Sequence, residues 1–330
     1  MSRKVLLIRF SSLGDVVLTS CLIEPFIKNG YKPILLTYRP YGELFSQDNR
    51  IGVIEVDKNT FRSIKKFFQL LEFLKETQPF AVIDLHANFK SFLVRKLLPA
   101  EVKTVYDKKA LFRRFCVFLN RLGLAERFKY NPLNVLHLYT QTLGVLGLKV
   151  ENPRPFIKVS PQSVEETLKK FSLKRGDYAV LGIGARYRKK EYPHFEELIK
   201  LLSQRLKVVL IGDKRDYEKS KDWKGVLNLC GKLSLIESLW VLKGAKVFVG
   251  NDSGATHMAR AVGTPAVVIY GGTHPCLGFA PSPNEGIVIS KNLSCSPCDL
   301  HGKGICNKNY DCLEIPPAEI AQKVFNMILK

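Results

Sequence analysis

One stretch of the chain combines glycines and hydroxyl residues between an apolar run and a helical segment: Val249–His257 (VGNDSGATH). Glycines at positions 250 and 254 let the backbone approach a ligand, and Ser253 and Thr256 offer hydroxyls at the helix start. Helix N-termini favour anions, because their N–H groups and the helix dipole point at the ligand. We therefore predict a diphosphate-binding turn here. A helix cap beside a buried histidine is the alternative interpretation.

Two further loops follow predicted strands and carry groups suited to the same ligand. Tyr270–Pro275 (YGGTHP) adds Gly272 and Thr273 beside the first turn. Gly184–Pro193 (GARYRKKEYP) holds four cations within five residues, and such charge stabilises a pyrophosphate leaving group. We predict Lys190 as the main contact of this loop, with a solvated charged turn as the alternative.

Carboxylates follow two other predicted strands. Asp216 lies just beyond Gly212 and Asp213, where acidic residues of nucleotide-binding folds bind a ribose hydroxyl. Asp15 ends the loop SSLGD after the first apolar run. Because transfer to a hydroxyl needs a base that takes its proton, we predict Asp15 as a catalytic base. Capping of the following helix is the alternative.

The segment from residue 88 to residue 130 is strongly basic, with 11 cations against 3 acidic residues, a local excess of +8. Phenylalanines and leucines alternate with these cations. A basic amphipathic surface of this kind suits a membrane interface that carries anionic lipid. A nucleic-acid patch and solvated helix faces over buried phenylalanines are the alternatives.

Size and charge limit the class of protein. A chain of 330 residues suits two α/β domains, and 46% hydrophobic residues predict a globular core. The formal charge of +21 favours anionic partners such as nucleic acid, phosphorylated glycans or acidic membranes. No run of 18 apolar residues occurs, and the N-terminal apolar run is too short for a signal peptide. We expect a protein of the cytoplasmic side.

The elements that must position these groups follow an alternating pattern. Short apolar runs predict strands at 5–8, 33–36, 52–56, 81–85, 102–105, 178–183, 207–211, 226–228, 247–250 and 266–270. Helices are predicted near 63–76, 195–204, 235–242, 257–262 and 317–329. This alternation predicts two doubly wound, mostly parallel sheets with a cleft between them. The proline-bearing stretch 151–161 is the expected linker, which gives domains 1–155 and 156–330.

Four of the eight cysteines gather in one C-terminal loop: Cys295, Cys298, Cys306 and Cys312. Four thiolates suffice for a tetrahedral zinc site, but the spacing is only half of a zinc-ribbon pattern. Structural thiols or disulfides are the favoured interpretation, and zinc is the alternative.

Taken together, the motifs resemble one family, the bacterial ADP-heptose lipopolysaccharide heptosyltransferases of glycosyltransferase family 9, which have the GT-B fold. Leu7–Val17 (LIRFSSLGDVV) is similar to the N-terminal signature of the family. The similarity continues, in the family's order, at 84–91, 190–193, 250–257, 263–275 and the cysteine loop.

The resemblance implies a role for each matching residue. Asp15 matches the proposed base, Lys190 matches a lysine on the donor diphosphate, and Asp216 falls near an acid that holds the ribose. The donor-binding residues implied are Lys190, Asp216, Asp252, Ser253, Gly254, His257, Gly272 and Thr273. The acceptor-binding residues implied are Ser12, Gly14, Arg62, Lys90, Arg113 and Arg114.

The resemblance also implies the reaction and its partners. We expect inverting transfer of heptose from ADP-L-glycero-D-manno-heptose to the Kdo/heptose inner core of lipopolysaccharide, without metal or other cofactor. The enzyme is expected to be a monomer, peripheral on the cytoplasmic face of the inner membrane, with no nucleic-acid partner. The helix at 317–329 is expected to pack back on the N-terminal domain.

Some positions depart from the family pattern, namely His86, Ala87, Ala185, Arg186, Asn251 and Ser253. They leave the donor nucleoside open, so another GT-B nucleotide-sugar transferase, or an epimerase with the same lobes, is the alternative enzyme. A nucleic-acid-binding protein is the alternative of a different class, but the sequence contains no recognition helix or aromatic-stacking strand motif.

Overall fold

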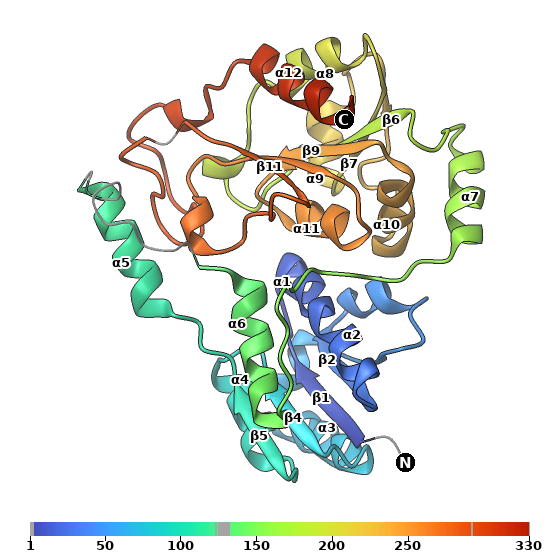
Figure 1. The fold of residues 1–330 in the computed structure, drawn as a ribbon, viewed down its shortest axis with the longest axis vertical. Coiled ribbons are helices and arrows are strands. Elements are labelled where there is room, and N and C mark those ends of the chain that lie inside the picture. Colours follow the sequence, from blue (N-terminus) through green and yellow to red (C-terminus); the bar gives the residue numbers. More distant parts are fainter. Residues whose placement is uncertain (1–2, 123, 125–132, 292, 330) are drawn as a thin grey trace. The chain divides into compact units, whose positions relative to one another are not determined.

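The computed structural model describes residues 3–122, 124, 133–291 and 293–329. The chain divides into two compact units (Figure 1). The first comprises Met1–Lys108 and Val135–Val159, and the second comprises Lys109–Asn134 and Ser160–Lys330.

The first unit is built on a five-stranded parallel sheet with the order β3-β2-β1-β4-β5. Its strands are β1 Arg3–Ile8, β2 Tyr31–Tyr38, β3 Gly52–Val56, β4 Ala81–Asp84 and β5 Val102–Val105. Val5 to Ile8 are fully buried, as expected for a central strand that is covered on both faces. The chain leaves β1 toward β2 and later returns to its other side at β4, so the loop after β1 lies at the switch point of the sheet.

The helices of the first unit are α1 Leu13–Leu18, α2 Ile23–Lys28, α3 Ile64–Glu76, α4 Phe89–Leu97 and α6 Val135–Gln141. Short 3₁₀ turns link them at Thr19–Leu22, Tyr41–Phe45, Lys58–Arg62 and Thr142–Leu146. An apolar core forms on one side of the sheet, where Ile8, Phe10 and Leu36 meet Leu70 and Leu74 of α3.

The second unit contains a six-stranded parallel sheet with the order β11-β10-β9-β6-β7-β8. Its strands are β6 Tyr178–Gly182, β7 Lys207–Ile211, β8 Val226–Asn228, β9 Val247–Asn251, β10 Ala266–Ile269 and β11 Gly286–Ile289. The switch point lies between β6 and β9, which are neighbours in the sheet. The chain runs from β6 outward to β7 and β8 and then returns to the other side of β6 at β9. Ligand-binding loops are therefore expected after β6 and β9.

The helices of the second unit are α5 Ala110–Arg121, α7 Pro161–Lys170, α8 Phe195–Leu202, α9 Lys214–Ser220, α10 Leu235–Gly244, α11 Gly254–Ala261 and α12 Pro317–Ile328. Short 3₁₀ turns occur at Arg188–Lys190, Pro275–Leu277 and Asp311–Leu313. In Figure 1, α8 and α12 lie side by side over one face of the sheet, and α10 and α11 cover the other.

The structure confirms the predicted pair of doubly wound α/β domains, with parallel strands at all ten predicted positions. The strand β11 was not predicted. Its apolar run is only Ile287–Ile289, after a polar loop, which is shorter than the strand pattern requires.

The division between the units differs from the expected one in two places. The boundary near the linker falls after Val159, and the segment 109–134 joins the second unit. The reason for the second difference is that α5 packs Phe112, Cys116 and Val117 against Cys276 and Leu277. The C-terminal helix α12 contributes its apolar face to the core of the second unit, next to α8. Within the described ranges, no helix is both long and apolar enough to cross a bilayer.

Candidate functional site

The centre of the second unit's site is an ion pair between the loops that follow β6 and β9. Lys190 Nζ lies 2.7 Å from Asp252 Oδ2, and the Thr273 hydroxyl donates to the same oxygen at 2.8 Å. Burial by itself raises the pKa of the Asp252 carboxyl, but the Lys190 charge and these hydrogen bonds outweigh it and lower that pKa. The structure therefore brings three of the predicted donor-binding residues together at the switch point.

Asn251 fixes the position of Lys190 relative to this turn. Its side-chain amide donates to the Ile183 carbonyl at 2.8 Å, and its side-chain oxygen accepts from the Tyr192 backbone N–H at 3.0 Å. The two bonds tie both ends of the cationic loop to the end of β9. Asn251 was considered only as a departure from the family pattern, and its supporting role is a finding of the structure.

The N-terminus of α11 follows directly. Ser253 occupies the N-cap position with an extended backbone, but its side chain makes no capping hydrogen bond to the helix. Thr256 instead donates to the Asn251 carbonyl at 2.6 Å, which ties the first turn of the helix to β9. Ser253 and Gly254 thus lie at the N-terminus of α11, where the helix dipole favours an anion, and their contact with a diphosphate stays a prediction.

His257 has a defined tautomer because of a buried arginine. Arg260 is 4% exposed, and its Nη1 lies 3.1 Å from His257 Nδ1 and donates to the Phe279 carbonyl at 3.0 Å. A guanidinium can only donate, so Nδ1 must accept and the ring proton of neutral His257 sits on Nε2.

Glu285 completes this arrangement. Its Oε2 accepts from Arg260 Nη2 at 2.9 Å, and the Arg260 charge keeps the pKa of Glu285 below its usual range although burial raises it. Arg260 and Glu285 were not predicted as part of the site. The sequence did not identify Arg260 because a single arginine in the short helix α11 does not indicate a function until its contacts with His257 and Glu285 are known.

The turn with Gly272 and Thr273 is clamped from both sides. The Gly272 N–H donates to the Lys189 carbonyl at 2.6 Å, and a Cβ at Gly272 would lie 2.6 Å from that of Lys189. The Ser296 hydroxyl bonds the Gly271 carbonyl at 2.5 Å, and the Cys298 N–H bonds that of Gly272 at 2.9 Å. The cysteine loop is therefore packed on the turn at Gly271–Thr273, which its sequence did not suggest.

The cysteines of that loop are thiols. All eight cysteines lie within the described ranges, and none forms a disulfide. Burial raises the pKa of Cys312 to about 12 and also raises that of Cys298. Among the described residues, no three His, Cys, Asp or Glu side chains are arranged to hold a metal ion. Of the two favoured interpretations, the structure has structural thiols rather than disulfides.

Asp216 has a structural position. It shares a capping box with Asp213, whose backbone N–H donates to Asp216 Oδ2 at 2.9 Å at the start of α9. A Cβ at Gly184 or Gly212 would lie 2.2 or 2.4 Å from its carboxylate, so both glycines are needed for this close approach. Burial raises the pKa of Asp216. Its contact with a ribose stays a prediction.

In the first unit, Asp15 forms an ion pair with Arg9 at the end of β1. Arg9 Nη2 lies 2.7 Å from Asp15 Oδ2, and Arg9 Nη1 donates to the Leu85 carbonyl at 2.6 Å. The Ser12 hydroxyl donates to Asp15 at 2.7 Å, and the two form a capping box for α1. Burial opposes ionisation, but Arg9 and Ser12 lower the pKa of Asp15. Asp15 thus caps α1, as the alternative interpretation predicted. Its role as a base stays a prediction.

The predicted acceptor residues fall in both units. Ser12 and the buried Gly14 lie in the β1 loop and first turn of α1, and exposed Arg62 ends a 3₁₀ turn. Lys90 Nζ lies 3.3 Å from the Tyr38 hydroxyl and 5.3 Å from the centre of the Phe61 ring. Phe61 in turn packs on Phe10 with ring centres 4.8 Å apart, so aromatic rings connect Lys90 with the β1 loop. This aromatic cluster was not predicted.

Arg113 and Arg114, the predicted acceptor residues on α5, belong to the second unit. Arg113 lies over the Phe279 ring at 5.1 Å, and Arg114 is exposed. His86, a departure from the family pattern, packs on Phe10, and its pKa falls to about 3 because of burial and the Arg9 and Lys108 charges. This histidine is therefore neutral at physiological pH.

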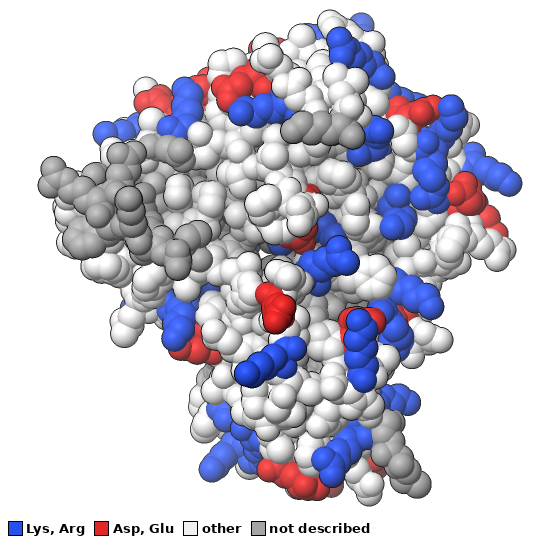
Figure 2. All heavy atoms as spheres, viewed as in Figure 1, with Lys and Arg blue, Asp and Glu red and all other residues white. Residues whose placement is uncertain are grey.

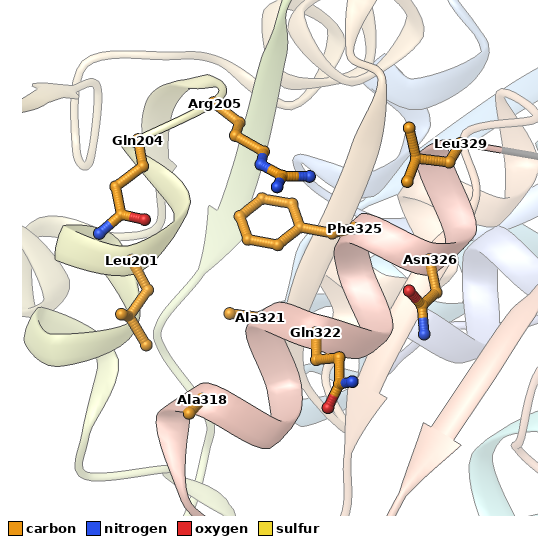
Figure 3. Close-up of a pocket in the computed structure, with 9 residues that line it drawn as sticks. All are labelled: Leu201, Gln204, Arg205, Ala318, Ala321, Gln322, Phe325, Asn326 and Leu329. Carbon is orange, nitrogen blue, oxygen red and sulfur yellow. The ribbon is translucent and has the colours of Figure 1, made fainter.

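A separate hollow of about 320 Å³ lies between α8 and α12 (Figure 3). Its only charged lining residue is Arg205, which lies over the Phe325 ring at 4.7 Å. Gln204 and Arg205 precede β7, so the hollow is at the amino edge of the sheet, opposite the loops after β6 and β9. Nothing in its lining suits the predicted chemistry.

Comparisons with known proteins agree on one family. The model of glycosyltransferase family 9 (heptosyltransferase) matches residues 67–308. Lipopolysaccharide heptosyltransferase 1 of Campylobacter coli is 27% identical over 305 residues, which covers 82% of this chain and 84% of the relative.

Solved structures show the same fold. ADP-heptose LPS heptosyltransferase II of E. coli superposes with a TM-score of 0.75 at 21% identity, covering 99% of this chain and 98% of its own. E. coli heptosyltransferase WaaC with ADP gives a TM-score of 0.66 at 22% identity, covering 90% and 96%. These likenesses confirm the GT-B fold that the resemblance implied.

Proposed function

This chain belongs to glycosyltransferase family 9, the heptosyltransferases, and from that premise we propose that it transfers heptose from ADP-L-glycero-D-manno-heptose to the Kdo/heptose inner core of lipopolysaccharide. The relatives named above support the substrate pair, since their names include ADP-heptose and lipopolysaccharide. The observation that carries the proposal is the Lys190, Asp252 and Thr273 cluster beside the α11 N-terminus, at the switch point of the second sheet.

The second unit is proposed to bind the donor. Lys190 and the first backbone N–H groups of α11 neutralise the diphosphate as it leaves. Asp252 holds Lys190 in place through the 2.7 Å ion pair. His257 adds a neutral Nε2–H donor, because Arg260 occupies its Nδ1. These groups supply the charge stabilisation that leaving ADP needs, from the chain's own residues.

The first unit is proposed to supply the base. The acceptor hydroxyl oxygen attacks the anomeric carbon from the face opposite the diphosphate, the bond from that carbon to the diphosphate oxygen breaks, and the configuration inverts. The hydroxyl proton passes to Asp15, which is ionised at neutral pH because Arg9 and Ser12 lower its pKa. Such a carboxylate is a weak base toward an intact alcohol, so the proton moves as the new bond forms.

The acceptor is anionic, and the proposal places cations near it. Lys90 and Arg62 of the first unit, and Arg113 and Arg114 of α5, are the proposed contacts to its carboxylates and phosphates. On the face drawn in Figure 2, lysines and arginines are scattered over the surface. We propose a monomer that works at the cytoplasmic face of the inner membrane.

The proposal is tested by supplying purified protein with ADP-heptose and a heptose-free Kdo-lipid A acceptor. Mass spectrometry should find one added heptose per acceptor and free ADP. A parallel series with UDP-, GDP- and other ADP-sugars examines the donor. A folded protein that binds none of the ADP-sugars, or that transfers a different sugar faster, contradicts the donor assignment.

A further inference from the structure

Helix α5 has two apolar faces, of which only one is covered. Cys116 and Val117 are buried against Cys276 and Leu277, with Phe112 packed beside them. Arg113 lies over Phe279 on the same side. This face joins the helix to the second unit and leaves the other side of α5 exposed.

The exposed side carries a row of four large apolar residues, which we call the α5 stripe: Leu111, Phe115, Phe118 and Leu122. Their exposed fractions are 81%, 48%, 56% and 54%. The spacing of four, three and four residues places them on one face of a helix. The Leu122 N–H bonds the Phe118 carbonyl at 3.2 Å, so the helical path continues to the end of the stripe.

The rest of the second unit does not expose its apolar residues in this way. Between residues 160 and 330, Ile305 and Leu329 are the exposed large apolar residues of the described chain. Single exposed residues are normal on soluble proteins, whereas a contiguous row marks an interaction site. The α5 stripe therefore needs a partner.

The charge of the helix identifies the kind of partner. Residues 108–121 contain five cations, Lys108, Lys109, Arg113, Arg114 and Arg121, and no acidic residue. Apolar residues on one face with a cationic remainder are the pattern of helices that lie in the headgroup layer of an anionic membrane. A two-fold dimer through the stripe would instead bring two segments of charge +5 together, which is unfavourable.

We propose that the α5 stripe inserts into the surface of an anionic bilayer, with α5 parallel to the membrane plane. The inference rests on the proposed function in one respect: a lipid-linked acceptor lies in a membrane, and the stripe is the surface that meets it. The phenylalanines and leucines enter the acyl boundary, and the cations of α5 contact lipid phosphates.

The test uses the full-length protein and vesicles of phosphatidylcholine, alone or with 30% phosphatidylglycerol. We expect binding to the anionic vesicles that weakens as salt rises. The double variant Phe115→Asn/Phe118→Asn should lower the partition coefficient at least about tenfold, because two half-exposed rings no longer enter the lipid. The matched control is Phe68→Asn/Phe73→Asn on α3, where the rings are 54% and 51% exposed. An equal loss for both variants overturns the assignment to α5.

A direct readout locates the stripe. In Phe118→Trp, the added fluorescence should shift to the blue and be quenched by brominated lipid, relative to the wild type with its two tryptophans. Phe68→Trp should show neither change. Light scattering that finds a dimer, which the stripe variant converts to a monomer, overturns the membrane assignment.

The failure of this inference and that of the proposed function are distinguishable. With a water-soluble Kdo acceptor that lacks acyl chains, the stripe variant should turn over within about twofold of the wild type, and only transfer to vesicle-embedded acceptor should fall. No transfer by wild-type protein to either acceptor contradicts the proposed function, while vesicle binding still decides the role of α5.

Discussion

Each unit places one ion pair at the switch point of its sheet, but the two pairs present opposite partners to solvent. In the first unit, the Asp15 side chain is 19% exposed and Arg9 is 9% exposed. In the second unit, Lys190 is 16% exposed and Asp252 is 12% exposed. The more accessible member is thus a carboxylate in one case and a cation in the other.

The hidden partners explain the difference. Arg9 donates both to Asp15 and to the Leu85 carbonyl, which fixes it in the floor of its loop. Asp252 accepts from both Lys190 and Thr273, which fixes it in the same way. In both units a buried ion is held by two bonds, and its partner is the more accessible group: a carboxylate in one unit and an ammonium in the other. This difference is what the proposed roles, a base for a hydroxyl and a cation for a diphosphate, require.

The largest expected effect follows from removing Asp15, the more accessible member of the first unit's ion pair. Asp15→Asn keeps the shape and the hydrogen bond to Ser12 but cannot take a proton. We expect kcat to fall about 10³-fold, with the Kd for ADP within about threefold of the wild type. Steady-state kinetics and calorimetry measure the two quantities.

The matched control is Asp213→Asn, which also removes a helix-capping carboxylate paired with an arginine. Asp213→Asn should keep normal turnover, which would show that the loss of a helix-capping carboxylate does not by itself explain the fall of kcat in Asp15→Asn. A parallel loss of ADP affinity in Asp15→Asn would show that the two pairs do not have separate roles.

The second effect concerns Lys190, the more accessible member of the second unit's ion pair. Lys190→Met should weaken ADP binding at least about tenfold and lower kcat about 10²-fold, because the leaving diphosphate loses its ammonium partner. It also leaves Asp252 without its ion pair, which should cost about 3 kcal/mol in the free energy of unfolding.

Two further variants separate these causes. Lys190→Met/Asp252→Asn should recover most of the stability and none of the activity. Arg188→Met, in the same loop, changes an exposed cation that lies over the Tyr310 ring and should bind ADP normally. Normal activity in the double variant would remove Lys190 from the donor site.

A smaller effect is expected from replacing Arg260, which contacts His257 in the second unit. Arg260→Met frees His257 Nδ1, so the ring no longer has a fixed tautomer, and kcat/KM should fall about tenfold. In Arg260→Lys, the lysine side chain can also only donate hydrogen bonds, so this variant should keep a higher kcat/KM than Arg260→Met.

The spectroscopic readout for this positioning role is the nitrogen-15 spectrum of His257. The wild type should show the proton on Nε2, and Arg260→Met should show a mixture. A proton on Nδ1 in the wild type contradicts the bond between Arg260 and His257.

The sequence was sufficient for ten of the eleven strands of the described chain and for the loops that carry Lys190 and Asp252. Buried parallel strands appear as continuous apolar runs, and the carboxyl ends of such strands meet at one edge of the sheet. The strand β11 was missed because three apolar residues after a polar loop are too few to identify a strand.

The pairings inside the site were harder to predict. Arg9 follows directly on an apolar strand and reaches Leu85, 76 residues away, which local pattern does not encode. Helix α5 belongs to the second unit because it packs on Cys276 and Leu277, a contact that only the folded chain shows. The basic segment was predicted to be a membrane surface, and that stays a prediction. Which of its phenylalanines are buried and which are exposed depends on the helix face, which only the folded chain shows.

The smallest effects test the same comparison through acid stability. The pKa values of Asp15 and Asp252 are lowered, so each carboxylate stabilises the fold above its unfolded pKa of about 4, and that stability is lost as the pH falls through the folded value. The pKa of Asp216 is raised by burial, so its contribution is present below about pH 4 and is lost as the pH rises through the folded pKa.

Urea unfolding at pH 7 and at pH 3 to 5 measures how the free energy of unfolding depends on pH, and so tests both expected directions. Asp252→Asn should lower the free energy of unfolding at pH 7 by about 1 kcal/mol and flatten its acid dependence. Asp216→Asn can still accept the bond from the Asp213 N–H and should raise that free energy by less than about 1 kcal/mol. Lys190 and the Thr273 hydrogen bond lower the pKa of Asp252, whereas burial and the Asp213 and Glu191 charges keep that of Asp216 raised. A decrease in the free energy of unfolding at pH 7 for both variants would therefore mean that shape, not charge, holds the switch-point loops.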